Sequence, residues 1–255
     1  MKLKDTDKDW EYFGQTDPYF GVLTWTDFKK ENLSAENRER FFASGQSYIT
    51  AVLQVLRDYI APGFDVAGAR ALDFGCGVGR LVIPLARVCG SVTGVDVSDA
   101  MLAEAQKNCR AYNIPNVDFT NNLETTEGTY DLIHSFIVFQ HIPAKRGEAI
   151  LKSLLGRLRE GGVGIIHLTY HRRESWSRRF LYQLHTTLPL LVGFWNLLKS
   201  RPFGQPIMQM NEYNLNHILQ MLQETGCHQC QLRFTQHGET SGVILFFQKK
   251  RLTIM

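Results

Sequence analysis

The sequence lacks several features that would assign the chain to a specialised class. It contains no run of like charges of the kind that forms a nucleic-acid tail, and its formal net charge is only +3. That charge permits an anionic partner without requiring one. Internal repeats and low-complexity segments are absent. Its first residues, MKLKDTDKDW, are too polar for a signal peptide, so we expect a cytoplasmic protein.

Cysteine is scarce and odd in number, which argues against a disulfide framework and favours reduced thiols. The five cysteines are Cys76, Cys89, Cys109, Cys227 and Cys230. Cys227 and Cys230 have C-x-x-C spacing, but no second pair accompanies them to complete a zinc site. We therefore expect no metal site.

The chain has 255 residues, of which 44% are hydrophobic, enough for a substantial core. Residues 1–44 are polar and rich in aromatic side chains, and we interpret them as an N-terminal cap. Residues 45–255 are expected to form the main domain. Its first helix is predicted to start at Ser44-Gly45 and to run to residue 60.

After residue 60, strand patterns alternate with helix patterns. Strands are predicted at 70–75, 91–97, 117–121, from 130 onwards, 163–170, 228–235 and 242–248. Helices are predicted at 80–89, 98–113, 144–162 and 211–226, with Ser98 and Asn211 as N-caps of the second and the last. The buried stripe of the last helix is expected to include Leu219. The pattern predicts an α/β fold whose parallel sheet has helices on both faces and ends in an antiparallel hairpin.

An insertion at 171–210 interrupts this alternation. It begins with four arginines (Arg172, Arg173, Arg178 and Arg179) and continues with an uncharged stretch, FLYQLHTTLPLLVGFWNLL. Polar residues and Pro189 make that stretch unsuitable for a membrane span. We expect a lid over a pocket, with an interfacial membrane helix as the alternative.

The segment ALDFGCGVGRL, residues 71–81, carries the strongest functional signal. A buried strand leads into three glycines, which let the backbone turn sharply and approach a ligand closely. A dinucleotide fingerprint needs a third glycine where Arg80 stands. Asp73 would repel a pyrophosphate but suits a cationic end such as an amino group. Asp96, at the end of the second strand, suits ribose hydroxyls, so the ligand described is S-adenosylmethionine (SAM).

Three motifs in order, DFGCGVGRL, VTGVDVSDAML and YDLIHSFIVFQHIP, resemble the class I SAM-dependent methyltransferases over roughly residues 45–170. The closing helix and hairpin fit that family's seven-stranded sheet. The resemblance implies that Asp73 and the glycine loop hold the methionine part of SAM, that Asp96 holds the ribose, and that Val97 and Met101 pack on the adenine. The expected cofactor-binding residues are Asp73, Gly75, Cys76, Gly77, Gly79, Arg80, Asp96, Val97, Met101, Asn121, Asn122, Ser135, Phe136, Tyr19 and Phe20.

Methyl transfer needs an aligned nucleophile and a way to remove its proton. His141, in the segment after the fourth strand, is a candidate general base because imidazole titrates near neutral pH. A structural role for it is the alternative. His171 and Tyr170, at the end of the fifth strand, are alternative bases. His134 and His167 lie within strands and are interpreted as satisfied core residues.

The stretch DPYF, residues 17–20, resembles the Asp-Pro-Pro-Tyr motif of amino-methyltransferases. That motif belongs at the end of the fourth strand, where this chain has FQHIP instead. The N-terminal aromatics are therefore interpreted as a cover for the cofactor, with Phe13, Tyr19 and Phe20 shielding the sulfonium. Plain packing of these rings onto the sheet edge is the alternative.

The expected function is transfer of a methyl group from SAM to a small molecule, at oxygen or alternatively at nitrogen, with S-adenosylhomocysteine (SAH) as product. Arg172 and Arg173 are expected to bind an acidic or polar group of an acceptor with an apolar body. The remaining alternatives are a nucleic-acid methyltransferase, a nicotinamide-dependent oxidoreductase, and a SAM-binding protein without catalysis that works at a membrane surface.

Overall fold

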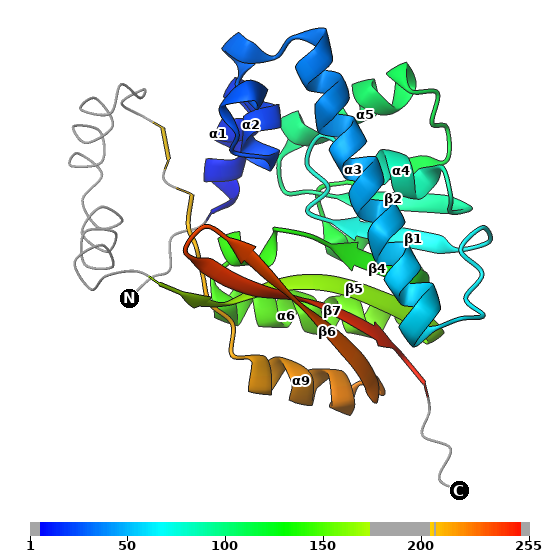
Figure 1. Ribbon diagram of the computed structural model, residues 1–255. Helices are drawn as coiled ribbons and strands as arrows, with labels where there is room; N and C mark the ends of the chain where they lie inside the picture. The colour runs from blue at the N-terminus through cyan, green and yellow to red at the C-terminus, as the bar shows by residue number, and fades with distance from the viewer. Residues whose placement is uncertain (1–5, 174–204, 207, 251–255) are drawn as a thin grey trace, which may run out of the picture.

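The computed structural model describes residues 6–173, 205–206 and 208–250. In this part of the chain, seven strands form one sheet in the order β3-β2-β1-β4-β5-β7-β6 (Figure 1). The strands are β1 (Arg70–Phe74), β2 (Ser91–Val95), β3 (Val117–Thr120), β4 (Tyr130–Ser135), β5 (Leu158–Arg172), β6 (Gln229–His237) and β7 (Thr240–Gln248). Strands β1 to β5 pair in parallel, and β7 runs antiparallel to β5 and β6. The predicted mostly parallel sheet with its C-terminal antiparallel hairpin is confirmed.

Helices cover both faces of this sheet. They are α1 (Asp7–Thr16), α2 (Pro18–Val22), α3 (Ala35–Val55), α4 (Val82–Ala86), α5 (Asp99–Ala111), α6 (Ala144–Arg157) and α9 (Leu215–Glu224). Short helical turns lie at η1 (Thr26–Phe28), η2 (Lys30–Asn32), η3 (Leu56–Ile60), η4 (Leu123–Thr125) and η5 (Phe139–His141). Helices α3 and α4 lie on one face, and α6 and α9 on the other (Figure 1).

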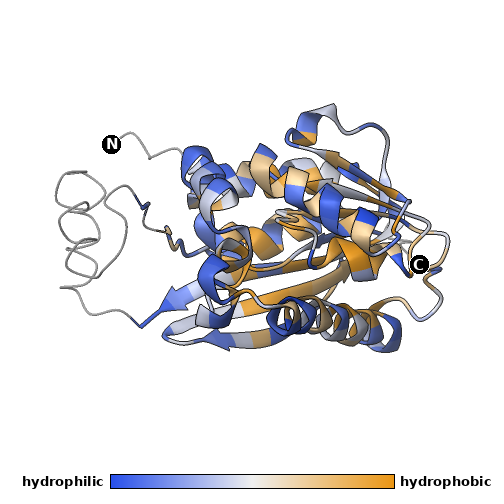
Figure 2. Cartoon of the chain, turned by 90° about the horizontal axis from the view of Figure 1, so that it is seen from above, coloured by the Kyte–Doolittle hydropathy of each residue, from blue (hydrophilic) through white to orange (hydrophobic). Residues whose placement is uncertain are grey.

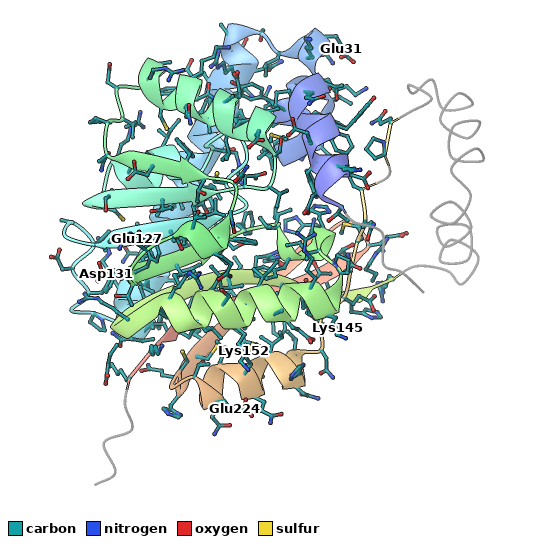
Figure 3. All side chains as sticks on the ribbon, turned by 180° about the vertical axis from the view of Figure 1, so that it is seen from behind. Glu31, Glu127, Asp131, Lys145, Lys152 and Glu224 are labelled. Carbon is teal, nitrogen blue, oxygen red and sulfur yellow. The ribbon has the colours of Figure 1, made fainter. Side chains whose placement is uncertain are left out.

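Successive side chains of each strand point to opposite faces of the sheet, and this alternation gives one hydrophobic core on each face. On β1, Ala71 packs with the helices of the first face, while Leu72 packs with those of the second. Leu132 and Ile133 on β4 divide in the same way. Figure 2 shows the apolar residues gathered on the central strands. Charged residues of α6, such as Lys145 and Lys152, point away from the sheet (Figure 3).

The predicted start of the first long helix at Ser44-Gly45 is wrong. Helix α3 begins at Ala35, and Ser34 caps it by accepting a hydrogen bond from the backbone N–H of Asn37 at 3.1 Å. Gly45 lies inside this helix. Glycine is required there because a Cβ would come within 2.3 Å of the Arg80 carbonyl oxygen. This glycine lets α3 pack closely on the segment before α4. The helix crosses the predicted boundary between residues 44 and 45, and that division remains a prediction.

Of the two predicted N-caps, one is confirmed and one is wrong. Ser98 caps α5 by accepting from the N–H of Met101 at 3.1 Å, which confirms the prediction. Helix α9 is capped by Asn214 and not by Asn211, which instead donates its backbone N–H to the Gln140 carbonyl at 2.6 Å. Leu219, predicted to be buried, is exposed on α9.

Most of the predicted insertion at 171–210 lies outside the described residues, including Arg178, Arg179 and the uncharged stretch. The expectations of a lid and of a membrane-surface helix therefore remain predictions. Among the residues that the structure describes, none of the helices has the length and apolar character needed to cross a membrane.

Candidate cofactor and acceptor site

The order of the parallel strands reverses between β1 and β4, and open α/β sheets bind ligands at such a point. The loop that follows β1 contains Gly75, Gly77 and Gly79, with φ angles of +74°, +52° and +86°. Residues with side chains rarely adopt these values. A Cβ at Gly75 would lie 2.3 Å from a Val138 methyl group, and one at Gly77 would lie 2.6 Å from a Val22 methyl group. Glycine is thus needed both for the turn and for the close approach of the segments that cover it.

Asp96 follows β2 directly and faces this loop. Its Oδ2 accepts a hydrogen bond from the backbone N–H of Gly77 at 2.9 Å, and its Oδ1 accepts one from Ser98 at 3.0 Å. Desolvation raises the pKa of Asp96 to about 6, while the two backbone donors act in the opposite direction. Carboxylate oxygens accept more than one hydrogen bond each, so this group can still hold ribose hydroxyls.

Asp73, near the end of β1, is buried beside the glycine loop. Its Oδ1 lies 2.7 Å from Nδ1 of His134 on β4. Its Oδ2 is buried and has no hydrogen-bond partner among the described residues. A buried carboxylate oxygen without a donor is costly, so this atom has the capacity to accept a further hydrogen bond.

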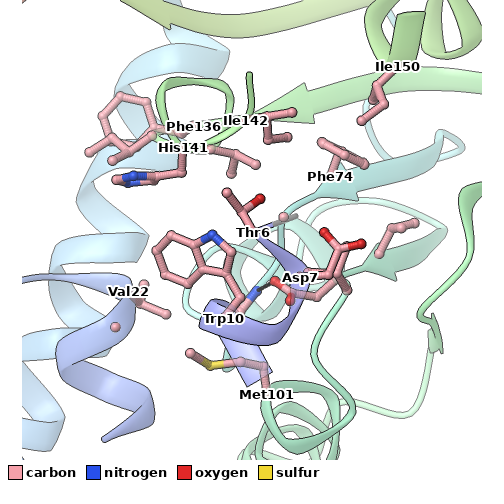
Figure 4. A pocket seen from close by; sticks show the side chains of 18 of the residues that line it. Thr6, Asp7, Trp10, Val22, Phe74, Met101, Phe136, His141, Ile142 and Ile150 are labelled. Atoms are coloured by element: carbon pink, nitrogen blue, oxygen red, sulfur yellow. Dashed lines mark hydrogen bonds between the residues drawn. The ribbon is translucent and has the colours of Figure 1, made fainter. Parts of the chain in front are cut away.

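A pocket of about 770 Å³, open to solvent at its mouth, lies over Gly75 and Gly77. The pocket is lined by Thr6, Asp7, Trp10, Gly21, Val22, Phe74, Gly75, Gly77, Val95, Asp96, Val97, Met101, Phe136, Ile137, Val138, His141, Ile142, Arg146 and Ile150. The Trp10 side chain lies in the middle of the group, between His141 and Met101 (Figure 4). Most of the wall is apolar.

Helix α1 is tied across the pocket to α6. The Arg146 guanidinium donates two parallel hydrogen bonds to the Asp7 carboxylate, at 2.7 and 2.8 Å. Both residues line the pocket. This bidentate pair holds the first turn of α1 over the site.

His141 lies at the pocket wall with both ring nitrogens engaged. Nδ1 lies 2.7 Å from the Gln209 carbonyl oxygen, which can only accept, so Nδ1 carries the proton. Nε2 lies 3.0 Å from the side-chain amide nitrogen of Gln140 and accepts from it. Burial lowers the pKa of His141 to about 4. The imidazole is therefore neutral at pH 7 and has its lone pair occupied, which suits a structural role better than that of a general base.

Ile137 has an unusual backbone. Its φ angle is +61°, which a β-branched residue adopts only when its surroundings force it. It lies two residues beyond the end of β4 and lines the pocket. Such strain, of order 1–3 kcal/mol, collects at functional sites.

Of the residues predicted from the sequence, seven line the pocket: Gly75, Gly77, Asp96, Val97, Met101, Phe136 and His141. Five others are buried and do not line it: Asp73, Cys76, Gly79, Arg80 and Ser135. Asn121 and Asn122 are exposed outside it, where Asn121 donates to Asp99 and Asn122 caps η4. Tyr170 and His171, near the end of β5, are not part of its wall either.

The three aromatic residues predicted to cover the cofactor, Phe13, Tyr19 and Phe20, do not line the pocket. Tyr19 is buried, and its hydroxyl lies 2.8 Å from a Glu104 carboxylate oxygen and 3.0 Å from the Asn108 side-chain oxygen. The Tyr19 ring packs edge-on against Phe41, away from the pocket wall. Phe20 lies under the Lys29 ammonium and also does not line the pocket. The alternative interpretation of these rings as packing residues fits their positions.

Trp10, Val22 and Arg146 line the pocket but were not predicted from the sequence. Nothing in the sequence distinguishes Trp10 from the other aromatic residues of the N-terminal segment. Arg146 lies in the first turn of α6, after HIP, and a charged residue on an amphipathic helix is ordinarily expected to face solvent. Its proximity to Asp7, 139 residues away, is a tertiary contact that local sequence does not encode.

Arg172, predicted to bind the acceptor, is engaged within the protein. Its backbone N–H donates to a Glu212 carboxylate oxygen at 2.8 Å, and its guanidinium donates to the Met210 carbonyl at 3.0 Å. It therefore fastens β5 to the segment before α9. The described residues contain no cluster of three or more metal-ligating side chains.

Comparison with known proteins agrees with this geometry. Residues 71–162 match the family model described as a methyltransferase domain. Magnesium protoporphyrin IX methyltransferase from Arabidopsis thaliana is 36% identical over 94 residues, which are 35% of this chain and 30% of that protein. Ubiquinone biosynthesis O-methyltransferase from Xanthomonas oryzae is 28% identical over 123 residues, which are 46% of this chain and 50% of that protein. The chain thus matches half or less of the length of these curated relatives.

The fold is shared over a longer range. The crystal structure of magnesium protoporphyrin IX methyltransferase from Synechocystis with bound SAH aligns with a TM-score of 0.64. The alignment covers 96% of this chain and 100% of that one at 20% identity, which shows a common fold. Residues 71–162 thus resemble the methyltransferase domain, and the chain as a whole shares the fold of that SAH-bound enzyme.

Proposed function

We propose that the chain transfers the methyl group of SAM to an oxygen atom of a small-molecule acceptor. The observation that carries the proposal is the pairing of two acids at neighbouring strand ends. Asp73 keeps a buried oxygen without a partner in the described structure, and Asp96 faces the glycine loop. One suits an ammonium group and the other suits ribose hydroxyls, at the two ends of one ligand.

The residues present fit SAM. Asp73 would hold the methionine ammonium, Gly75 and Gly77 would face the chain that joins it to the sulfur, and Asp96 would hold the ribose. Val97 and Met101, both at the pocket wall, would pack on the adenine. SAM supplies a methyl group on a sulfonium, which an aligned nucleophile displaces in line.

The chain contributes alignment and exclusion of water more than proton transfer. Trp10 and Val22 bring α1 and α2 over the pocket, and the Asp7–Arg146 pair keeps them there. His141 has a pKa lowered to about 4 and its Nε2 already accepts from Gln140, so it is a weak base. This arrangement favours an acceptor oxygen that is already ionised at neutral pH. His141, His171 and Tyr170 remain predictions as catalytic residues.

An apolar acceptor body is supported by the pocket wall, where Phe136, Ile137, Val138, Ile142 and Ile150 lie together. Oxygen as the acceptor atom is supported by the relatives, one of which is named an O-methyltransferase of ubiquinone biosynthesis. Nitrogen remains the alternative. The cytoplasmic location also remains a prediction, because one relative is chloroplastic.

The test is methyl transfer from SAM with a carbon-13 methyl group to a panel of apolar carboxylic acids, phenols and amines. Mass spectrometry would locate the label, and SAH would be measured in parallel. We expect SAH formation that depends on a carboxylic acid, and a label on oxygen. Asp96→Ala, as the control variant, should abolish it. A label on nitrogen would favour the alternative acceptor. SAM binding without transfer to any acceptor would favour the non-catalytic role.

A further inference from the structure

A buried histidine lies next to Asp73, the acid proposed above to hold the methionine end of SAM. Asp73 on β1 and His134 on β4 are register partners in neighbouring parallel strands. Both side chains are at most 2% exposed, and Nδ1 of His134 lies 2.7 Å from Oδ1 of Asp73. A carboxylate oxygen accepts, so the His134 Nδ1–H donates. The pair forms a buried contact between neighbouring strands.

The far side of His134 is also held. Its Nε2 lies 3.4 Å from the hydroxyl oxygen of Tyr48 on α3, and the two rings meet edge-on with centroids 5.7 Å apart. Burial raises the pKa of Tyr48 well above its usual value, so this hydroxyl keeps its proton. The Tyr48 ring in turn packs on Phe136, which lines the pocket. Three elements, β1, β4 and α3, thus fix the orientation of the imidazole.

With Oδ1 engaged, the Asp73 carboxylate cannot rotate without losing its hydrogen bond. Its Oδ2 is then presented in one direction, buried and without a partner in the described part of the chain. Nε of Arg80, whose charge interacts with that of Asp73, is also buried without a hydrogen-bond partner among the described residues. A carboxylate anchored by one oxygen and open at the other is arranged for a cationic N–H donor that the protein itself does not supply.

We propose that His134 is a positioning residue for the cofactor: it anchors Asp73 through Oδ1 so that Oδ2 receives the α-ammonium of the methionine end of SAM. The proposal rests on the proposed function and deepens it. His134 does not touch the cofactor, and it acts through the direction in which the Asp73 carboxylate points. Without the imidazole, the carboxylate turns and the ammonium loses its best acceptor, while the nucleoside end stays held by Asp96.

A purely structural His134 makes a different prediction. In that case its loss would loosen the whole site and weaken every ligand alike. The positioning role weakens only ligands with the amino acid end. SAH carries that end, whereas 5′-methylthioadenosine has the same nucleoside and sulfur without it. The ratio of the two affinities therefore reports on Asp73 and cancels general damage.

The experiment is calorimetric titration of the full chain with SAH and with 5′-methylthioadenosine. We expect His134→Leu to weaken SAH binding about 10-fold and to leave 5′-methylthioadenosine within about 2-fold. His134→Asn keeps an N–H donor on the same strand and should restore most of the SAH affinity. His167→Leu is the matched control, because His167 is buried on β5 and lies 2.9 Å from the Thr235 hydroxyl instead of Asp73. It should leave the ratio unchanged.

The outcomes distinguish a failure of the proposed function from a failure of the positioning role alone. If the wild type does not bind SAH, the proposed function fails and this proposal fails with it. If the wild type binds SAH but His134→Leu weakens both ligands equally, or neither, only the positioning role is refuted. Should His134→Leu not fold by circular dichroism, His134→Asn and Tyr48→Phe carry the test. Two results together would support the proposal: a SAH-to-methylthioadenosine ratio at the wild-type value in His134→Asn, and a proton on Nδ1 of His134 in the wild type, seen by nitrogen-15 NMR. An unprotonated Nδ1 would refute it.

Discussion

Lowering the pH should weaken SAH binding through Asp96 in particular. Desolvation raises the pKa of this carboxyl to about 6 in the free protein. Only the ionised form offers both oxygens as acceptors to two ribose hydroxyls, since a protonated carboxyl turns one oxygen into a donor. Binding therefore requires deprotonation, and the affinity must fall as the pH falls through about 6.

The size of the effect follows from the pKa. With a value of about 6, about one tenth of the sites are ionised at pH 5 and nearly all at pH 7.5. The dissociation constant of SAH should thus be about 10-fold larger at pH 5, equivalent to about 1.4 kcal/mol of binding free energy. The same shift has the opposite sign for the stability of the free protein. The raised pKa stabilises it below the ordinary aspartate value, and this contribution is lost as the pH rises through about 6.

The assay is titration with SAH at several pH values from 5 to 7.5, using the quenching of tryptophan fluorescence, because Trp10 lies in the pocket. Asp96→Asn should bind weakly and with a flat pH profile. The reasoning would be refuted by a flat wild-type profile, or by an Asn variant that keeps the wild-type slope. The second result would assign the titration to another group.

Three further predictions concern the segments around the pocket. Arg146→Met breaks the bidentate pair with Asp7, so hydrogen exchange of the α1 amides should become several-fold faster. The free energy of unfolding should fall by under about 1 kcal/mol, because both partners are partly exposed. Unchanged exchange would contradict the role of the pair. Ile137→Gly should be more stable than Ile137→Ala by about 1 kcal/mol, and should therefore unfold at a higher temperature, because glycine accepts the positive φ. Equal melting temperatures would contradict the presence of strain at this position. Tyr19→Phe should lower stability by about 1–2 kcal/mol, because it removes the hydroxyl whose single proton is shared between Glu104 and Asn108, and should leave SAH affinity within about 2-fold. A 10-fold loss of affinity in that variant would restore Tyr19 as a cofactor contact.

The sequence predicted those features whose causes are local. A buried strand followed by spaced glycines predicts a turn, and Gly75 and Gly77 have the positive φ angles that the turn needs. Ser98 lies directly before an amphipathic stretch and caps it. Alternating strand and helix patterns were enough for the sheet and its antiparallel end, because each element carries its own periodicity.

Features set by contacts between distant segments were not predictable. The density of aromatics predicted an N-terminal cover, but the choice of Trp10 over Tyr19 depends on how α1 and α2 meet at Asp17, where φ is −153° and ψ is 68°. Gly45 looked like a helix start because glycine is poor inside helices, yet its reason is the backbone of Arg80. A packing partner 35 positions away leaves no local mark.

His134 shows how both kinds of information combine. Its place within a strand predicted a satisfied core residue, and its ring nitrogens do have neighbours in Asp73 and Tyr48. The strand register supplies what the sequence does not, namely that one neighbour is the acid of the glycine loop. A residue interpreted as structural is thereby connected to the proposed cofactor site.

The central claim is that the crevice above β1 and β4 holds SAM, and equilibrium binding of SAH tests it most directly. Isothermal titration of the full chain at pH 7.5 with SAH, and in the same buffer with NADH, gives both answers in one experiment. The account predicts saturable binding of one SAH per chain and no heat of binding with NADH. No binding of SAH, or binding of NADH in its place, would contradict it.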